Sequence, residues 1–198
     1  MNNLTVKKGA NLTLEPGLVI KFASRHSRIF VNGGLALAGT AASKITLTHL
    51  SDDNAGASST PTDNDTEGNG NATKPAAGDW GGLQFNATTN DAFSKIEYTD
   101  ILYAGTSNNS SYYENDGAVL LYSAAPTFKN VNINQSGSFG FTFNNVSTPV
   151  LENVAIRNCT WDPFAISLFA DPTLTNITLV QNGSNGIRII DRTIGSNA

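Results

Sequence analysis

The chain of 198 residues is long enough for one domain with a continuous core, and its single cysteine, Cys159, excludes an internal disulfide and a thiolate metal site. The formal net charge is −4, and Lys and Arg are scattered apart from a small group at Lys21, Arg25 and Arg28, so a nucleic-acid partner is disfavoured. No apolar run reaches the roughly 18 residues of a membrane span, so we expect no membrane insertion by this segment.

Short β-strands are predicted from the N-terminal part of the chain onward. Apolar and polar residues alternate over three positions in several runs, at 12–14, 45–47 and 141–143. No window carries the apolar stripe of an amphipathic helix. Three positions recur after 23 residues, since Leu12 and Leu14 match Leu35 and Leu37, and Phe22 is aligned with Ile45. A fixed interval of this size is typical of stacked repeats.

The segment 51–78 interrupts the strands. It is rich in Asp, Asn, Gly and Ser and nearly free of large apolar residues, which predicts a loop insertion. Within it, Asp63, Asp65 and Glu67 alternate before Gly68, as in the first half of a loop that binds Ca²⁺. Lys74 stands where such a loop has its last glutamate, so a solvated loop without metal is the alternative. We expect no required cofactor, with Ca²⁺ as a candidate ligand of these three carboxylates.

The repeat becomes strict after this insertion. A segment that begins at residue 94 fits it, a second insertion follows at about 106–116, and three copies begin at Pro126, Pro149 and Pro172. The apolar columns of these copies are Phe128, Leu151 and Leu174, then Val131, Val154 and Ile177, then Ile133, Ile156 and Leu179. Three copies in one register are strong evidence for a repeat architecture.

Short strands at this period predict a coil in which each winding, or rung, lies on the previous one at about 4.8 Å. Without the insertions the chain gives roughly seven rungs. Phe128, Leu151 and Leu174 should then form one interior stripe. We predict a single β-helix domain over residues 1–198 and expect it to be a fragment of a longer chain.

An asparagine column accompanies the apolar ones, at Asn130, Asn153 and Asn176. Phe128 and Val131 are three positions apart and must both face inward, so the alternation must be reset between them. A left-handed backbone conformation resets it, and Asn tolerates this conformation better than most residues. We also predict hydrogen-bonded amides from rung to rung, a buried Asn176 side chain, and an end of this ladder where Tyr98 occupies the column.

Three stretches carry a resemblance: "LTVKKGANLTLEPGLVIKF" at 4–22, "LALAGTAASKITLTHLSDD" at 35–53 and "GDWGGLQF" at 78–85. With them the chain resembles the right-handed parallel β-helix proteins of the pectate-lyase-like superfamily, in particular the β-helix module of large bacterial and archaeal surface proteins. Together with the repeat, the resemblance predicts an all-β, single-stranded right-handed parallel β-helix (solenoid) of about 23 residues per rung, with loop insertions at about 51–78 and 106–116. It implies no particular activity, because this fold hosts both enzymes and inert scaffolds.

Aromatic residues on loops are the candidates for contact with a polysaccharide or glycan, because their rings can stack on sugar faces. We expect Tyr112 and Tyr113, in the second insertion, and Trp161, in the turn "CTWDPF", to make this contact. Anchoring of the loops is the alternative role. Trp80, in "GDWGG", is expected to pack over the edge of the coil instead.

Low charge and abundant hydroxyl and amide groups suit an exposed stalk. We expect a non-catalytic, extracellular β-helix module of a cell-surface protein, acting as a rigid stalk or display scaffold with adhesion or carbohydrate contact through its loops. Among the Asn-x-Ser/Thr motifs, Asn71 and Asn108 are the candidate glycosylation sites because both lie in insertions.

Two alternatives to this function are kept open. One is a polysaccharide lyase or glycoside hydrolase of the β-helix class, although the outward strand columns do not place two carboxylates on neighbouring rungs. The other is a self-assembling filament or surface-layer subunit, because uncapped ends of a coil expose unpaired strand edges. Expected partners are therefore a polysaccharide or glycan, neighbouring domains of the same chain, or other copies end to end, with the secretion signal outside this segment.

Overall fold

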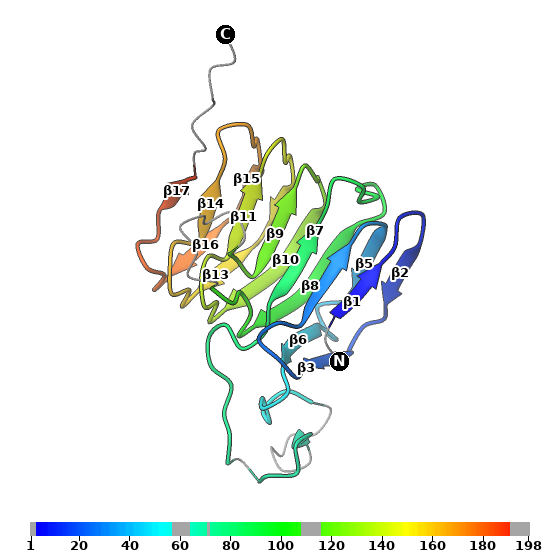
Figure 1. Cartoon of the computed structure of the whole chain (residues 1–198), viewed down its shortest axis with the longest axis vertical. Coiled ribbons are helices and arrows are strands. Elements are labelled where there is room, and N and C mark those ends of the chain that lie inside the picture. Colours follow the sequence, from blue (N-terminus) through cyan, green and yellow to red (C-terminus); the bar gives the residue numbers. More distant parts are fainter. Residues whose placement is uncertain (1–2, 57–63, 71, 108–115, 191–198) are drawn as a thin grey trace.

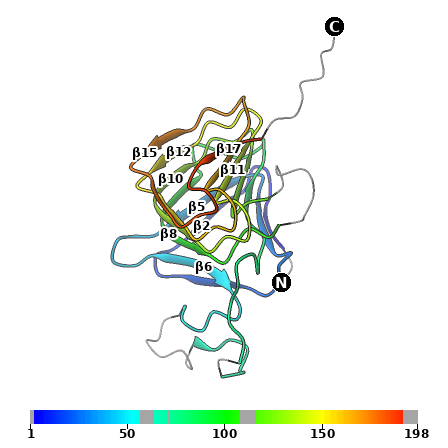
Figure 2. The ribbon, with the colours of Figure 1, turned by 90° about the vertical axis from the view of Figure 1, so that its left-hand side faces the viewer.

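The computed structural model describes residues 3–56, 64–70, 72–107 and 116–190, and the regular elements of these ranges are all β-strands. Successive windings of the chain stack from the N-terminal strands to the C-terminal strands (Figure 1). A view along the stack shows the strands arranged around the sides of a coil (Figure 2). Within the described part of the chain, no helix is long and apolar enough to span a membrane.

One side of the coil is a parallel sheet with one strand from each winding. Among the described residues it has seven strands, in the order β1 (Asn3–Val6), β4 (Arg28–Val31), β7 (Gly82–Phe85), β9 (Val119–Tyr122), β11 (Phe141–Asn144), β14 (Phe164–Ile166) and β17 (Ile187–Ile189). The strand order follows the chain order, so each winding adds one strand beside the previous one. We call this the first sheet.

The second sheet has two rows of parallel strands. One row holds β2 (Asn11–Leu14), β5 (Gly34–Ala38), β8 (Lys95–Leu102), β10 (Thr127–Asn134), β12 (Val150–Glu152) and β15 (Thr173–Thr175). The other row holds β3 (Val19–Phe22), β6 (Ile45–His49), β13 (Ala155–Arg157) and β16 (Thr178–Val180). Both rows meet in β8 and β10, whose two halves pair with different neighbours.

A left-handed bend separates the two rows and gives the coil a third side. The backbone has φ of 42° at Tyr98, 56° at Asn130, 55° at Asn153 and 52° at Asn176. Phe128 and Val131 lie on either side of the bend, and both side chains are buried. The bend therefore resets the alternation of inward and outward side chains, as the sequence predicts. The bend continues at Tyr98, although tyrosine rarely adopts this conformation.

The asparagine side chains at this bend are hydrogen-bonded from rung to rung. Asn153 Nδ2 donates to Asn130 Oδ1 (3.3 Å), and Asn176 Nδ2 donates to Asn153 Oδ1 (3.1 Å). The prediction that Asn176 is buried is wrong, because its side chain is exposed at the corner of the coil. The ladder therefore stabilises the outside of the corner while the apolar columns fill the inside.

The predicted interior stripe is confirmed. Phe128 pairs with Leu151, and Leu151 pairs with Leu174 in the next strand. Phe128 and Leu151 are fully buried, while Leu174 packs against the core from the last rungs and is only partly buried. Aromatic rings from the first sheet complete this core, since the Phe141 ring meets the Phe128 ring edge-on at a centroid distance of 5.1 Å.

One predicted alignment near the N-terminus is wrong. Phe22 pairs with His49, not with Ile45. The cause is the turn between β5 and β6, which is longer than the turn between β2 and β3 and shifts the following strand along the sequence. The windings therefore keep their contacts while the sequence interval changes.

The long insertion leaves and rejoins the stack at neighbouring points, and lies outside it beyond β3 and β6 (Figure 1). At its return, the Trp80 ring stacks on the Phe22 ring at a centroid distance of 4.0 Å, and Trp80 Nε1 donates to the Leu102 carbonyl oxygen (2.7 Å). Trp80 is fully buried in the core, so its role is structural, as expected. Beside it, Asp79 Oδ2 lies 3.8 Å from His49 Nδ1, at the point where the insertion departs.

The bend at Asn153 can be tested by two substitutions. Asn153→Ala removes both ladder bonds and forces Ala into the left-handed region, so we expect a loss of about 2 kcal/mol in the free energy of unfolding. Asn153→Gly removes the same bonds but tolerates positive φ, and we expect it to cost about 1 kcal/mol. Urea denaturation measures both values. Equal losses in the two variants would contradict the role of the bend.

Candidate functional site

The turns that lead from the second sheet into the first lie on one edge of the coil, which we call the turn edge. Consecutive turns are joined by backbone hydrogen bonds: the Gly81 amide donates to the Ser27 carbonyl (2.7 Å), and the Gly183 amide donates to the Trp161 carbonyl (2.8 Å). Both insertions also depart from this edge, after β6 and after β8. Candidate ligand-contacting residues from different rungs are therefore concentrated along one line of the molecule.

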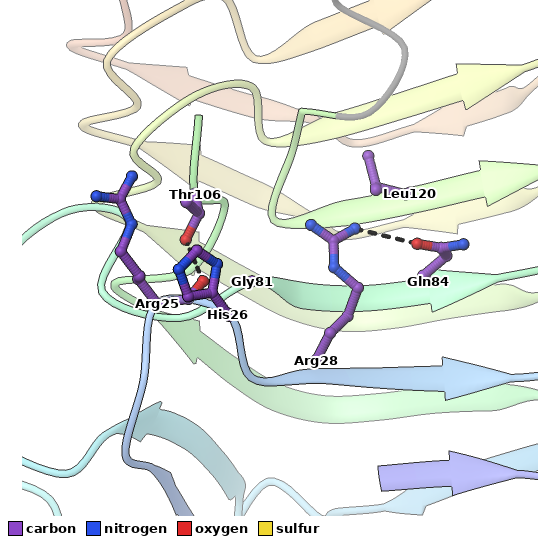
Figure 3. A pocket seen from close by; sticks show the side chains of 7 residues that line it. All are labelled: Arg25, His26, Arg28, Gly81, Gln84, Thr106 and Leu120. Atoms are coloured by element: carbon purple, nitrogen blue, oxygen red, sulfur yellow. Dashed lines mark hydrogen bonds between the residues drawn. The ribbon is translucent and has the colours of Figure 1, made fainter. Parts of the chain in front are cut away.

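A polar hollow lies at the N-terminal part of the turn edge, and we call it the arginine hollow. It has a volume of about 240 Å³. Figure 3 shows Arg25 and His26 on the turn before β4, Arg28 on that strand, and Gln84 on the neighbouring strand. Three windings that are distant in sequence thus supply side chains to one hollow.

Arg28 is partly buried in this hollow. Its Nη1 donates to Gln84 Oε1 (3.3 Å), which fixes the direction of the guanidinium group. Burial lowers the pKa of Arg28, while the electrostatic influence of Tyr122 and Asp116 raises it. Gly81 leaves room for this side chain, because a Cβ at that position would lie only 3.0 Å from Arg28 Nε.

Thr106 holds the turn that carries the other two basic residues. Its Oγ1 lies 2.7 Å from the carbonyl oxygens of both Arg25 and Gly78, so the hydroxyl can donate to either. The bond to Arg25 ties the backbone of this turn to the winding that carries Thr106, although the Arg25 side chain itself is exposed. The turn is held in place while its charged side chain reaches solvent.

A second hollow, of about 480 Å³, lies at the C-terminal part of the turn edge, and we call it the tryptophan hollow. Trp161 lines it, and its ring contacts the buried Phe139 ring edge-on at a centroid distance of 5.0 Å. Arg188 belongs to the same lining and lies over Phe139, with its guanidinium carbon 5.6 Å from the ring centroid. Trp161 is the predicted contact residue that belongs to the described part of the chain, and it lines this hollow.

Asp162 also lines the tryptophan hollow and is only 5% exposed. Its Oδ2 accepts a hydrogen bond from Arg188 Nε (2.7 Å), and its Oδ1 accepts one from the Ser184 hydroxyl. Burial by itself raises the pKa of Asp162, but these hydrogen bonds and the Arg188 charge outweigh it, so the pKa lies below the ordinary value of 3.8. The carboxylate is therefore ionised at neutral pH.

The described part of the long insertion folds around Asp65. Asp65 Oδ1 accepts hydrogen bonds from the amides of Glu67 (3.1 Å) and Gly68 (2.8 Å), and Oδ2 accepts one from Gly70 (2.6 Å). The bond from Gly70 is the main cause that lowers the pKa of Asp65. Glu67 Oε2 accepts a bond from Asn69 Nδ2 (3.0 Å). Among the described residues, no three His, Cys, Asp or Glu side chains gather closely enough to hold a metal ion.

Several predicted site residues fall outside the described ranges: Asp63, Asn71, Asn108, Tyr112 and Tyr113. The arginine hollow, in contrast, was missed from the sequence. Its signal was the small basic group, of which Arg25 and Arg28 enter the hollow. Lys21 does not, because its Nζ donates to the Asn64 carbonyl oxygen in the insertion (2.7 Å).

Cys159 provides no reactive thiol. Its side chain is buried, and burial raises the pKa to about 12, against a smaller lowering by a backbone hydrogen bond of Ser136. A protonated thiol is neither a nucleophile nor a good metal ligand. The chemistry of the described surface therefore rests on the two hollows and the Asp65 loop.

A coil of parallel sheets with its hollows and insertions on the turns defines the class of β-solenoid proteins. The family model described as "right handed beta helix region" matches residues 34–197, and the chain belongs to this family. The curated proteins and the solved structures give no match. Members of a shared fold can be enzymes or non-enzymes, so family membership alone assigns no activity.

The ionised Asp162 should make stability depend on pH. Because its folded pKa is lowered, the carboxylate stabilises the fold above pH 3.8, and this contribution is lost as the pH falls through the folded pKa. We expect Asp162→Asn to lower the free energy of unfolding by about 1 kcal/mol at neutral pH, and the difference from the unsubstituted chain to shrink in acid.

Urea unfolding at about pH 6, 4 and 3 measures this difference. Asp171→Asn, at an exposed aspartate outside the hollow, is the control and should leave the pH profile unchanged. A difference between Asp162→Asn and the unsubstituted chain that stays constant from pH 6 to pH 3 would contradict the assigned role of Asp162.

Proposed function

We propose that the chain is a non-catalytic, extracellular β-helix module of a cell-surface protein, a rigid scaffold that contacts carbohydrate at the turn edge. The observation that carries this proposal is the tryptophan hollow, where an aromatic ring stands beside a hydrogen-bonded polar network. A sugar has an apolar face that stacks on aromatic rings and hydroxyl groups that bind planar polar groups such as carboxylate and guanidinium. Trp161, Asp162 and Arg188 supply these three kinds of group in one hollow.

The order of this hollow supports a binding role. Phe139 supports Trp161 from the core, and Asp162 is held by Ser184 and Arg188. Groups that are already fixed before a ligand arrives lose less conformational entropy on binding. Tyr112 and Tyr113 remain predicted as further contacts from the second insertion.

The carboxylates support the non-catalytic reading over the lyase or hydrolase alternative. Glycoside cleavage commonly needs two carboxyl groups that face each other across the bond. The described linings of the arginine and tryptophan hollows contain one carboxylate between them, Asp162. A third hollow, beside Lys21, also has one in its described lining, Asp65.

The regular stack supports the scaffold role. Each winding contacts its neighbours through in-register parallel pairs, so stiffness extends over the length of the coil. At the C-terminal end, Ile189 on β17 is more than half exposed and does not line the tryptophan hollow. This end would be covered by a neighbouring domain of the same chain or by another copy, the partners that the sequence predicts.

Carbohydrate contact can be tested on an array of immobilised neutral and acidic glycans, followed by titration of the strongest hit. We expect Trp161→Ala to weaken that binding about tenfold and Trp161→Phe to retain most of it, because Phe keeps an aromatic face. Phe169→Ala removes an exposed aromatic ring outside the hollow and should leave the affinity unchanged. Absence of any glycan hit, or equal loss in Trp161→Ala and Phe169→Ala, would overturn the proposal.

We also propose that the Asp65 loop binds Ca²⁺, with Asp65 and Glu67 as ligands and Asp63 as the predicted third. The ionised Asp65, the oxygen-rich neighbours Asn69 and Thr73, and the glycine five residues after Asp65 support this, since hard cations prefer oxygen ligands on a tightly turned loop. The backbone conformation at Gly70 is left-handed, with φ of 62°.

Added Ca²⁺ at about 1 mM should raise the melting temperature and slow cleavage by a glutamate-specific protease after Glu67. Both effects should disappear in Asp65→Asn and persist in Asp171→Asn, which removes an exposed carboxylate elsewhere. If Ca²⁺ changes neither quantity, or acts equally on both variants, the loop is not a calcium site.

A further inference from the structure

We propose that the arginine hollow binds a small tetrahedral oxyanion, a phosphate or sulfate group, either free or as an ester on a hydrophilic ligand. The site is formed by Arg25 and His26 on the turn before β4, Arg28 on that strand, and Gln84 on the next (Figure 3). The tryptophan hollow lies several windings away on the same edge, so this proposal does not rest on carbohydrate binding there.

The charge of the hollow is opposite to that of the chain. The chain carries a formal charge of −4, yet two guanidinium groups and an imidazole line this one hollow. The negative charge of Asp116 favours the charged form of Arg28 and offsets part of its positive charge. Arg25 adds a second positive charge on the exposed turn, so the hollow keeps an excess of positive charge that attracts an anion.

The number and placement of the donors favour a tetrahedral anion over a carboxylate. A single arginine fork can satisfy both oxygens of a planar carboxylate. Here the donors come from the turn before β4, with Arg25 and His26, and from β4 itself, with Arg28, an arrangement that suits an anion whose oxygens point in several directions. A phosphate or sulfate group has that shape.

The size and lining of the hollow limit the ligand. Its 240 Å³ is below the range of about 300–1,000 Å³ of sites for drug-sized molecules, which suits one small group. Leu120 is the one large apolar side chain among its described lining residues. A hydrated, polar ligand is therefore favoured over one with an apolar body.

The hollow is organised before a ligand arrives. Gln84 orients Arg28, Thr106 ties the Arg25 backbone to a later winding, and Gly81 leaves the space that Arg28 occupies. Burial removes part of the water from the Arg28 guanidinium, and a charged group that has lost water gains more from an anionic partner.

The test is calorimetric titration of the whole chain with inorganic phosphate, inorganic sulfate, glucose 6-phosphate, glucose 6-sulfate and acetate. Low ionic strength is needed, because salt screens partly exposed charges. We expect the phosphate and sulfate probes to bind at least about tenfold more tightly than acetate. Binding of the esters as well as the inorganic ions would indicate an esterified ligand, whereas binding of the inorganic ions alone would indicate a free anion.

Substitutions locate the site. Arg25→Gln and Arg28→Gln should each weaken phosphate binding about tenfold, while Arg28→Lys, which keeps the charge but loses the fork, should fall between. Lys95→Gln removes an exposed positive charge on the second sheet and is the matched control. Because Arg25 is exposed, Arg25→Gln tests the site even if substitution of the partly buried Arg28 disturbs folding.

Three results would overturn the proposal. The first is absence of phosphate and sulfate binding at millimolar concentration. The second is equal weakening in Lys95→Gln and Arg25→Gln, which would indicate a general charge effect. The third is acetate binding as tight as phosphate binding, which would show that the hollow does not select a tetrahedral anion.

Discussion

A left-handed bend in each winding from β8 to β16, at Tyr98, Asn130, Asn153 and Asn176, is the constraint on which the architecture depends. The bend lets two residues three positions apart both face the interior, and it divides one sheet into two rows, which gives the coil its third side. With three sides, similar residues of successive windings lie above one another, and a core forms that no single winding could bury alone. The amide ladder on the outside of the corner stabilises the bend where the column is asparagine.

The same stacking produces the candidate sites. Because each winding returns to the first sheet at the same edge, residues from windings far apart in sequence meet there. Arg25 and Thr106 are 81 positions apart and hydrogen-bonded, and Arg188 reaches back 26 positions to Asp162. Neither hollow is a local motif, because each combines residues from windings that lie apart in the sequence.

The features that repeat were predictable from the sequence, and those that arise from stacking across insertions were not. The interior stripe and the Asn153 bend could be predicted because three copies share one interval. Phe22 was aligned with the wrong residue because the turn between β5 and β6 is longer than the corresponding turn one winding earlier. The amino-acid composition of that turn does not reveal its greater length. A second left-handed column, at Tyr103, Gln135, Asn158 and Gln181, was not predicted because Asn158 is its one residue of a type that favours this conformation. The arginine hollow needs Gln84 and Thr106 beside Arg25, a proximity that only the register of the windings creates.

The way Trp80 closes the long insertion has a consequence for how such chains can diversify. Its ring stacks on Phe22, and its indole N–H donates to the Leu102 carbonyl oxygen. These two contacts fix the place at which the chain rejoins the coil, whatever the preceding insertion contains. Loop closure costs little more as a loop lengthens. The segment between β6 and Trp80 can thus vary in length and sequence. A foreign peptide could be grafted there while the coil retains its shape.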